Sequence, residues 1–237
     1  MNLSKSKYCN GVQCPKMLWL DKNYPELKGD IDIQSILDNG TEVGKLAQNL
    51  FKNHIDIKYN DNLSIMVNDT KALLNINNIV ITEASFIYDN NFCSVDILKK
   101  ENEYVEIYEV KSSTKLKNVF ITDVAYQTYI LKKLGFKIKS ANIVYINSNY
   151  EFIDKLDLKK LFIIEDVTDK VLSQFAELEE NIRTLKETLD NKMEPDIDID
   201  NYCFKPYSCP FFKYCTNNLP DNNIFNIRIM RNSSKIK

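Results

Sequence analysis

The sequence predicts a mixed α/β fold whose core runs β-β-β-α-β. Turn residues such as Asp89-Asn90-Asn91 separate three β-like runs, which predicts an antiparallel meander over residues 79–88, 92–99 and 104–111. The next segment, 119–134, carries apolar positions at helical spacing and ends at Gly135, a residue that often terminates helices. Residues 138–146 then return as a strand rich in β-branched side chains.

The segments before this core contain two predicted helices and an edge region. The pair Cys14-Pro15 indicates the start of a helix, because proline is tolerated in the first helical turn. Apolar side chains recur at helical spacing over 36–51, where Gly40 and Gly44 are expected to allow close packing against the sheet. Residues 55–77 are rich in Asn and Asp, which predicts one or two short strands near an edge of the sheet.

One long helix is predicted after the core, over residues 168–191. Its apolar positions form a single stripe, and Thr168 is expected to cap its amino-terminal end. At a rise of about 1.5 Å per residue, this helix would be roughly 36 Å long. It is therefore expected to bring the carboxyl-terminal segment back to the start of the chain, and residues 220–237 are expected to form a tail or linker.

The composition is that of an ordinary globular protein. Of the 237 residues, 44% are hydrophobic and 27% are charged. A chain of this length can bury one sizeable core, here over about 36–146, within a single domain predicted to span residues 1–219. The start has no apolar signal segment and no run is long enough to span a membrane, which predicts a cytoplasmic protein with no membrane partner. The net charge of -2 excludes an all-over basic surface, so nucleic-acid binding would need a local patch.

Two acids and a lysine lie on neighbouring predicted strands. Side chains alternate faces along a strand, so Glu109 and Lys111 share a face, and Asp96 lies on the strand before. Two carboxylates can hold Mg²⁺ through oxygen ligands, and a nearby lysine can orient or help deprotonate the attacking water and offset charge on a phosphate. The alternative is an ordinary ion pair, in which Lys111 alone compensates the carboxylates. The acid in the strand before and the helix-strand unit after favour the metal site.

Three carboxyl-terminal cysteines form a second candidate site, because Cys203, Cys209 and Cys215 are spaced Cys-x5-Cys-x5-Cys. In a reducing compartment, metal binding explains such cysteines better than disulfides do. Zinc sites usually contain Cys-x2-4-Cys pairs, so the spacing disfavours a zinc ribbon. Iron–sulfur clusters also take four thiolates, and Cys14 or Cys9 can supply the fourth if the long helix returns the tail to the start of the chain.

The motifs resemble those of a nuclease superfamily. SVDIL followed by YEVKSS is similar to the core motif of the PD-(D/E)XK nucleases, and DVAYQTYILKKLG resembles the glutamine-bearing helix of their RecB-like branch. The resemblance implies a restriction-endonuclease-like mixed sheet flanked by helices. It also implies that Asp96 and Glu109 hold Mg²⁺ or Mn²⁺, that Lys111 assists the attacking water, and that Gln127 positions the substrate or a metal-bound water.

The opening QCPKMLWL resembles the leading cysteine motif of RecB-like nucleases that contain an iron–sulfur cluster, such as the CRISPR-associated adaptation nucleases and the AddB-type repair nucleases. These proteins take one cysteine before the nuclease core and three after it. The resemblance therefore implies a structural 4Fe-4S cluster that joins residues 3–20 to residues 168–219, with Cys9 and Cys93 as ordinary buried thiols. The implied ligands are Cys14, Cys203, Cys209 and Cys215.

The resemblance is strongest to a bacterial family of uncharacterised proteins that shares the LSKSKY…QCPK…LWL opening. Members of that family often continue into a further domain, so a protein partner or a further domain is expected here too. Relatives often carry a metal-binding histidine on the helix before the sheet, where this chain has Gly44, and the lone His54 lies beyond it. Glu42 or Glu83 can replace that ligand, but a solvated Glu42 and a structurally paired Glu83 are equally open alternatives.

A modest basic stretch follows the acids. Seven lysines and a single acid, Asp123, lie between residues 111 and 139. Beside an active site, such a surface can bind a phosphate backbone, and Lys115, Lys117 and Tyr126 are the predicted contacts. The alternative is a solvated helix face.

Three functions remain open from the sequence. The first is a Mg²⁺- or Mn²⁺-dependent nuclease, an exonuclease acting on DNA rather than RNA at single strands or ends. The second is an inactive nuclease-fold module that binds nucleic acid for a partner, and the third is an iron–sulfur redox or sensor protein. Residues 196–207 lack the Gly and Glu of an EF-hand, no glycine-rich phosphate loop exists, and one histidine gives little support to a catalytic triad.

Overall fold

The computed structural model describes residues 3–29, 34–227 and 234. The chain divides into two compact units, of which the first holds Met1–Lys5 and Ile33–Leu178 and the second holds Ser6–Asp32 and Glu179–Lys237. The predicted single domain over 1–219 stays a prediction. The predicted tail over 220–237 begins with a 3-10 turn at Ile224–Asn226, and residues 228–233 and 235–237 of this tail lie outside the described residues.

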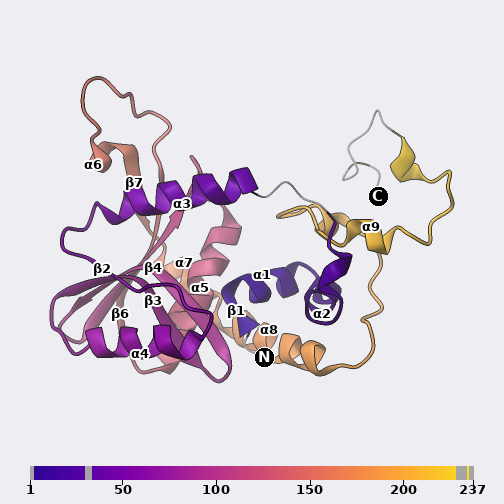
Figure 1. Ribbon diagram of the computed structural model, residues 1–237, viewed down its shortest axis with the longest axis horizontal. Helices are drawn as coiled ribbons and strands as arrows, with labels where there is room; N and C mark the ends of the chain where they lie inside the picture. The colour runs from indigo at the N-terminus through magenta and orange to yellow at the C-terminus, as the bar shows by residue number, and fades with distance from the viewer. Residues whose placement is uncertain (1–2, 30–33, 228–233, 235–237) are drawn as a thin grey trace. The chain divides into compact units, whose positions relative to one another are not determined.

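The first unit is built on a seven-stranded mixed sheet (Figure 1). The strands follow the order β2-β3-β4-β5-β6-β7, and β1 pairs separately with β4. Their bounds are β1 Leu3–Ser4, β2 Ile55–Asp56, β3 Ile79–Tyr88, β4 Asn91–Glu101, β5 Tyr104–Lys111, β6 Lys137–Ile146 and β7 Phe162–Asp166. The strands β3, β4 and β5 form the predicted antiparallel meander, and β6 runs parallel to β5. The mixed α/β class with its β-β-β-α-β core is therefore confirmed.

The crossover between the two parallel strands is helix α5, Asn118–Lys133. Two parallel strands run in the same direction, so the chain between them must return to the end of the sheet where the first strand began. A two-residue hairpin is too short for this, and a crossover helix is long enough. The helix ends where predicted, since Gly135 adopts a φ of 91°, which a side chain would disfavour. Five consecutive residues of β5, from Val105 to Glu109, are buried, so both faces of this strand are covered.

Two helices cover opposite faces at β4 and β5. Helix α5 packs across β3 to β6, and its Gln127 side chain hydrogen-bonds to Glu109. Helix α3, Gln34–Gln48, packs Ala47 against Ile97 and Tyr108. Because neighbouring residues of a strand alternate faces, Tyr108 points to the sheet face opposite to that of Glu109. Glu109 therefore contacts α5 from the sheet face that this helix covers.

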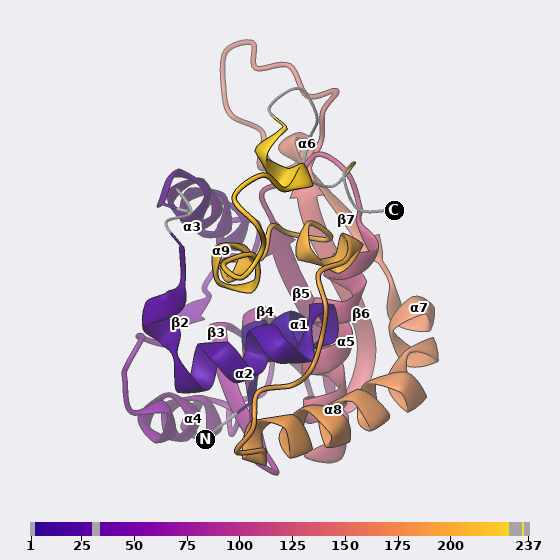
Figure 2. The same cartoon turned by 90° about the vertical axis from the view of Figure 1, so that its right-hand side faces the viewer.

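The remaining elements of the first unit surround the sheet. Their bounds are α4 Leu63–Leu73, α6 Leu158–Leu161 and α7 Thr168–Ser173. Figure 2 shows the loop before α6 projecting past the ends of β6 and β7. Within the described parts of the chain, every helix is too short or too polar to cross a membrane.

Three predictions about individual elements are wrong. Residues 55–77 contain the predicted edge strand β2, but also helix α4, whose start is capped by the Asn62 side chain accepting from the Ser64 amide. The single helix over 168–191 is two helices, α7 and α8, with Gln174 between them; α8 spans Phe175–Asp190. Thr168 is not the cap, because its hydroxyl oxygen accepts from the Ala141 amide of β6.

The second unit joins the start of the chain to its end. Its elements are most of α1 Lys5–Gln13, α2 Pro15–Asn23, a 3-10 turn Pro25–Leu27, the later part of α8, a 3-10 turn Asn201–Cys203 and α9 Phe212–Cys215. Helices α1 and α8 pack closely, since a Cβ on Gly11 would lie 2.7 Å from a Leu185 methyl. The Trp19 indole donates to the Asn191 carbonyl at 2.9 Å. The predicted return of the tail to the opening segment is thus confirmed, although a helix shorter than predicted achieves it.

A buried carboxylate on β5 generates a prediction about stability. The Glu106 carboxylate accepts hydrogen bonds from Tyr108 at 2.6 Å, Lys139 at 2.9 Å and Lys99 at 3.2 Å. Burial raises the pKa of Glu106, but these three donors outweigh it and lower the pKa to about 2.

We expect Glu106→Gln to reduce the free energy of unfolding at pH 7 by about 1.5–3 kcal/mol, the usual range for hydrogen bonds to a charged group. Because the folded pKa is depressed, this contribution is present above the ordinary pKa of 4.5 and is lost as the pH falls toward 2. Urea unfolding of both proteins between pH 7 and pH 3 measures it. A difference in the free energy of unfolding between the two proteins that stays constant from pH 7 to pH 3 would contradict the role of the Glu106 carboxylate. The control is Glu103→Gln, an exposed partner of Lys137, which should leave the free energy of unfolding almost unchanged.

Candidate functional site

Three acids lie in one row across β3, β4 and β5. The strand registers pair Thr82 with Ile97 and Ile97 with Tyr108, so the next positions place Glu83 opposite Asp96 and Asp96 opposite Glu109. Directly opposed residues of antiparallel strands share a face. The structure thus brings together Asp96 and Glu109, which the sequence predicted, with Glu83, which was one of two open alternatives. We call Glu83, Asp96 and Glu109 the acid row.

The sheet is interrupted at the acid row. The β3–β4 pairing skips Glu83, and the β4–β5 pairing ends at Ile97 and Tyr108. The Asp96 carboxylate fills the gap by accepting from the Val110 amide at 2.7 Å. Glu83 has a φ of 56°, a left-handed conformation unusual for a residue with a side chain, and its carbonyl accepts from Ser85 at 3.0 Å and Ser94 at 3.2 Å. Backbone strain of this kind is concentrated at functional sites.

The acid row opens into a cleft of about 690 Å³. Helix α3 forms one wall through Gly40 and Gly44, which were expected to pack against the sheet. That expectation is wrong, because a Cβ at either glycine would meet no atom within 4 Å. Glu42 on the same helix is exposed and does not line the cleft. His54 also lies outside the lining, with its Nδ1 3.0 Å from the Phe51 carbonyl oxygen.

Lys111 lies beside the row as a charged ammonium. Its Nζ is 2.8 Å from Glu109 Oε1, and it also donates to Asp123 of α5 and lies 5.3 Å from the Phe120 ring centroid. Burial lowers the pKa of Lys111, but the Glu109 and Asp123 carboxylates outweigh it and raise the pKa above its usual range. A protonated lysine can orient a water or offset negative charge, but it cannot accept a proton. Asp123 was not predicted as a site residue, although its position one turn before Gln127 places both on one helix face.

Gln127 holds Glu109 in place. Its side chain is fully buried, and its Nε2 donates to Glu109 Oε2 at 2.6 Å and to the Ser94 carbonyl at 3.4 Å. Its Oε1 is buried and has no hydrogen-bond partner among the described residues. Gln127 is absent from the cleft lining. The structure therefore makes it a residue that orients Glu109, rather than one in contact with the open cleft.

Lys5 also reaches the acid row, which the sequence analysis missed. Strand β1 pairs with the start of β4, Leu3 with Asn91, and this pairing brings the Lys5 Nζ to 2.6 Å from Glu109 Oε1. Burial lowers the pKa of Lys5, but the Glu109 and Asp96 carboxylates outweigh it and raise the pKa. A two-residue strand has too little periodicity to be found in the sequence, so no local signal indicated this contact.

The three acids are in different electrostatic environments. Burial raises the pKa of Glu109, but Lys111 and Lys5 outweigh it and lower the pKa to about 2. Burial, followed by repulsion from Glu109, raises the pKa of Asp96 to about 6. Burial, followed by repulsion from Asp96, raises the pKa of Glu83 to about 7. Asp96 and Glu83 are thus short of positive charge, and a cation near them would stabilise their ionised forms.

Of the three predicted nucleic-acid contacts, two are exposed and one is buried. Lys115 and Lys117 are exposed on the segment after β5, and Lys117 lies 5.5 Å from the Phe120 ring centroid. Tyr126 is fully buried, and its hydroxyl donates to the Leu3 carbonyl. The prediction that Tyr126 contacts nucleic acid is therefore wrong, because α5 turns this residue toward the sheet and β1.

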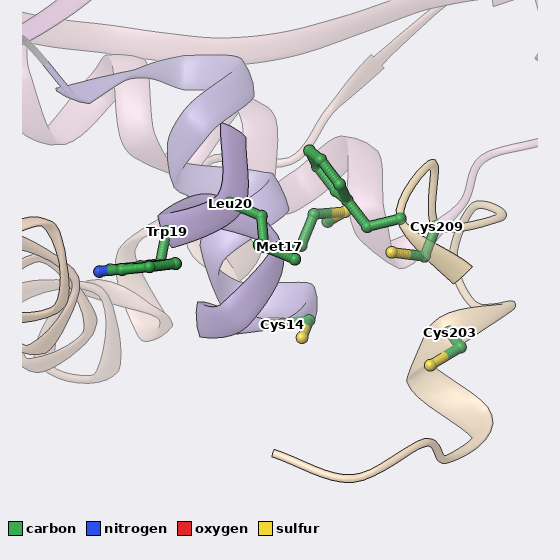
Figure 3. Packing of buried hydrophobic residues seen from close by; sticks show 7 residues of the cluster. Cys14, Met17, Trp19, Leu20, Cys203 and Cys209 are labelled. Atoms are coloured by element: carbon green, nitrogen blue, oxygen red, sulfur yellow. The ribbon is translucent and has the colours of Figure 1, made fainter. Parts of the chain in front are cut away.

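The second unit gathers the four predicted cysteines. Cys14, Cys203 and Cys209 are buried together with Trp19 and Phe211, as Figure 3 shows for α2 and the carboxyl-terminal segment beside it. Cys14 precedes α2, with Pro15 at the first helical position as predicted. Burial raises the pKa of Cys209 to about 12, helped by the neighbouring thiols Cys14, Cys203 and Cys215. The four predicted cysteines therefore lie in the same unit, and three of them belong to one buried cluster.

The other two cysteines differ from each other. Cys93 is buried in β4 as expected, but Cys9 is only half-buried. In the part of the chain that the structure describes, which includes all six cysteines, none is in a disulfide bond. Four thiol donors fit zinc or an iron–sulfur cluster.

As they stand, no three His, Cys, Asp or Glu side chains of the described residues converge closely enough to hold one metal ion. In the acid row, Lys5 and Lys111 both donate to Glu109 Oε1. The donor set nevertheless suits a hard divalent ion, because it offers carboxylate oxygens on adjacent strands and the unpartnered Gln127 Oε1 close behind them.

Fold and site together define a mixed α/β protein with an acidic cleft where the β4–β5 pairing ends and the β3–β4 pairing skips Glu83. No protein-family model matches the chain, and no curated protein matches it. Among solved structures, the crystal structure of SSO0001 aligns with 90% of this chain and 86% of its own, at 15% identity and a TM-score of 0.38. The function proposed below therefore rests on the geometry of the cleft and on the motifs.

Proposed function

We propose that this protein is a nuclease that hydrolyses DNA phosphodiester bonds with Mg²⁺ or Mn²⁺, as an exonuclease on single strands or ends. The observation that carries the proposal is the acid row with Lys111 beside it, in a cleft where the sheet is interrupted. Perturbed carboxyl pKa values in a cleft are typical of functional sites. The motifs that resemble the PD-(D/E)XK core fall on these same residues.

The donor set assigns a role to each residue. Asp96 and Glu109 would hold the divalent ion, with Glu83 as a third carboxylate on the neighbouring strand. Such an ion supplies an activated water and polarises the phosphate. Gln127 fixes the orientation of Glu109, and Asp123 fixes Lys111. The Lys111 ammonium would offset the negative charge that develops on the phosphate.

The exposed lysines support a nucleic-acid substrate. Lys115 and Lys117 follow Lys111, which lines the cleft, by only a few residues. Phosphate contacts of this kind increase affinity without regard to sequence. The preference for DNA over RNA comes from the resemblance, and we also propose a cytoplasmic location, in keeping with six free cysteines.

We further propose that Cys14, Cys203, Cys209 and Cys215 hold a 4Fe-4S cluster. These residues come from the opening helices and from the tail, which pack together in the second unit. The cluster would act as a structural clamp between these two segments rather than as a redox centre. Zinc remains the competing occupant, because it also takes four thiolates.

A second candidate function is an inactive nuclease-fold module that binds nucleic acid for a partner. Two observations favour it. Gly44 contributes no ligand to the cleft wall where relatives often have a histidine, and Lys5 is bound to a predicted metal ligand. A third candidate, a redox or sensor protein, is supported by the cysteine group alone.

Cleavage of labelled single-stranded DNA by anaerobically purified protein with Mn²⁺ tests the main proposal. We expect Asp96→Asn and Lys111→Ala each to lower the rate by at least about 100-fold, because each removes a group that stabilises developing charge. The matched control is Lys170→Ala, which removes an exposed lysine paired with Glu165 and should leave the rate unchanged. Binding without cleavage in the wild type would favour the inactive module. If the wild type shows neither binding nor cleavage, the nuclease and the inactive binding module are both contradicted.

Adding the histidine of the relatives tests the cleft geometry. A side chain at Gly44 meets open space, so Gly44→His is expected to place an imidazole at the cleft and to tighten Mn²⁺ binding by about tenfold, or about 1.4 kcal/mol. Isothermal titration with Mn²⁺ measures it. Gly44→Ala controls for the gain in helix propensity, because it adds no ligand. Equal Mn²⁺ affinity in the two variants would show that residue 44 does not face the ion.

Iron analysis tests the cysteine proposal. Anaerobic protein is expected to contain about four iron atoms per chain, as a single cubane cluster requires. Cys209→Ser should lose this iron and lower the melting temperature, because ligand binding and folding are coupled. Cys93→Ser is the matched control, since Cys93 is buried outside the group and its variant should retain the iron. Stoichiometric zinc in the wild type would contradict the cluster.

A further inference from the structure

A lysine from the start of the chain is bound to an acid far along the sequence. Lys5 and Glu109 are 104 positions apart, and their side chains are 22% and 2% exposed. Burying an ammonium group is unfavourable unless it is paired, so this contact is more than an ordinary surface ion pair. The short strand β1 holds Lys5 in place, since Leu3 and Ser4 pair with Asn91 and Phe92.

Glu109 does not need Lys5 to be satisfied. Lys111 already donates to Glu109 Oε1, and Gln127 donates to Oε2. A carboxylate offers about four lone-pair positions, and Lys5 uses one more of them. A divalent ion that binds Glu109 together with Asp96 would therefore compete with Lys5 for Glu109 Oε1 and for the surrounding negative potential.

The two lysines differ in how firmly they are held. Lys111 donates to Asp123 as well as to Glu109, and it also lies over the Phe120 ring. Within the described residues, the structure gives Lys5 one ion-pair partner, Glu109. Lys5 can therefore leave the acid row by breaking one ion pair, whereas Lys111 would stay bound to Asp123.

Charge balance also favours an exchange. Lys111 is shared between Glu109 and Asp123, so it compensates the acid row only in part, and Lys5 adds a second cation at Glu109. A divalent ion carries one more positive charge than Lys5 does and is small enough to lie between adjacent strands. The row is therefore better compensated by the ion than by the lysine.

We propose that Lys5 is a tethered counter-ion of the acid row, which a divalent metal ion must displace, so that Lys5 sets the metal affinity of the site. The proposal rests on the proposed metal site of Asp96 and Glu109. When no metal is bound, Lys5 holds the acids together against their mutual repulsion. A metal ion held by Asp96 and Glu109 would release the Lys5 ammonium from Glu109 Oε1.

Direct measurement of Mn²⁺ binding to the full chain tests this proposal, with free Mn²⁺ determined by electron paramagnetic resonance. We expect Lys5→Met, which keeps the length of the side chain, to bind Mn²⁺ at least about tenfold more tightly than the wild type does. Lys5→Arg, which keeps the charge, should bind as weakly as the wild type. The matched control is Lys58→Met, because Lys58 lines the same cleft but pairs with Asp56.

A second measurement uses the wild-type protein alone, so it does not depend on a variant folding. The acetylation rate of each lysine by an amine-reactive ester is followed by mass spectrometry, with and without Mn²⁺. Lys5 should react slowly without the ion and several-fold faster with it, because an ion-paired, partly buried amine is protected. Lys137, an exposed lysine, should react equally in both conditions.

The outcomes separate this inference from the proposed function. Equal Mn²⁺ affinity in wild type and Lys5→Met, with unchanged acetylation, overturns the inference and leaves the metal site intact. Weaker binding by Lys5→Met also overturns it, since Lys5 would then position Glu109 for the metal. Absence of Mn²⁺ binding from the wild type and from Lys5→Met overturns the metal site and the inference together.

Discussion

The burial of the Glu109 carboxylate is the constraint on which the rest of the site depends. This side chain is almost fully enclosed, yet it stays ionised because Lys111, Lys5 and Gln127 all donate to it. Each donor comes from a different element: the same strand, the start of the chain and α5. An isolated buried charge would be very unfavourable, so these three elements are bound to one another through a single side chain.

A second carboxylate, Asp96, accounts for the interruption of the sheet. If β4 and β5 stayed paired beyond Ile97, the Val110 amide would bond to backbone, and the Asp96 carboxylate would have no donor. Instead, the amide binds Asp96 and the strands separate, while Glu83 leaves the β3–β4 pairing in a left-handed conformation. The sheet gives up regular hydrogen bonds where the acids gather, and the cleft opens at that place. Such strain is stable only when the surroundings determine it strongly.

The second unit depends on a different kind of contact. Its opening helices and tail are far apart in the sequence, and apolar packing around Trp19, Met17 and Phe211 joins them. Cys14, Cys203 and Cys209 lie within this apolar group, where burial favours the neutral thiol over the thiolate. A metal centre there would have to supply the positive charge that the surroundings lack. The proposed cluster and the proposed metal site thus share one requirement, since each depends on a cation to compensate grouped anions.

Local patterns in the sequence were enough to predict the sheet core and the main acids. Strands of alternating or continuous apolar residues and a helix ended by Gly135 follow from short-range preferences, and the positions of Asp96, Glu109 and Lys111 follow from the period of a strand. The same reasoning failed at α4, because Asn- and Asp-rich segments suit both turns and helix caps. It also failed over 168–191, where the Thr168 hydroxyl binds a neighbouring strand rather than its own helix.

Only the tertiary structure decided which groups surround Glu109. Lys5 is brought there by a two-residue strand, Tyr126 is turned inward by contact with Leu3, and Gly44 lies on a cleft wall rather than in a helix–sheet contact. Each of these depends on chain segments separated by tens of residues, and no short window of sequence contains both partners. Site residues that share a strand or a helix could therefore be predicted from the sequence. The charge balance of the site could not, because that balance is set by pairings across the whole first unit.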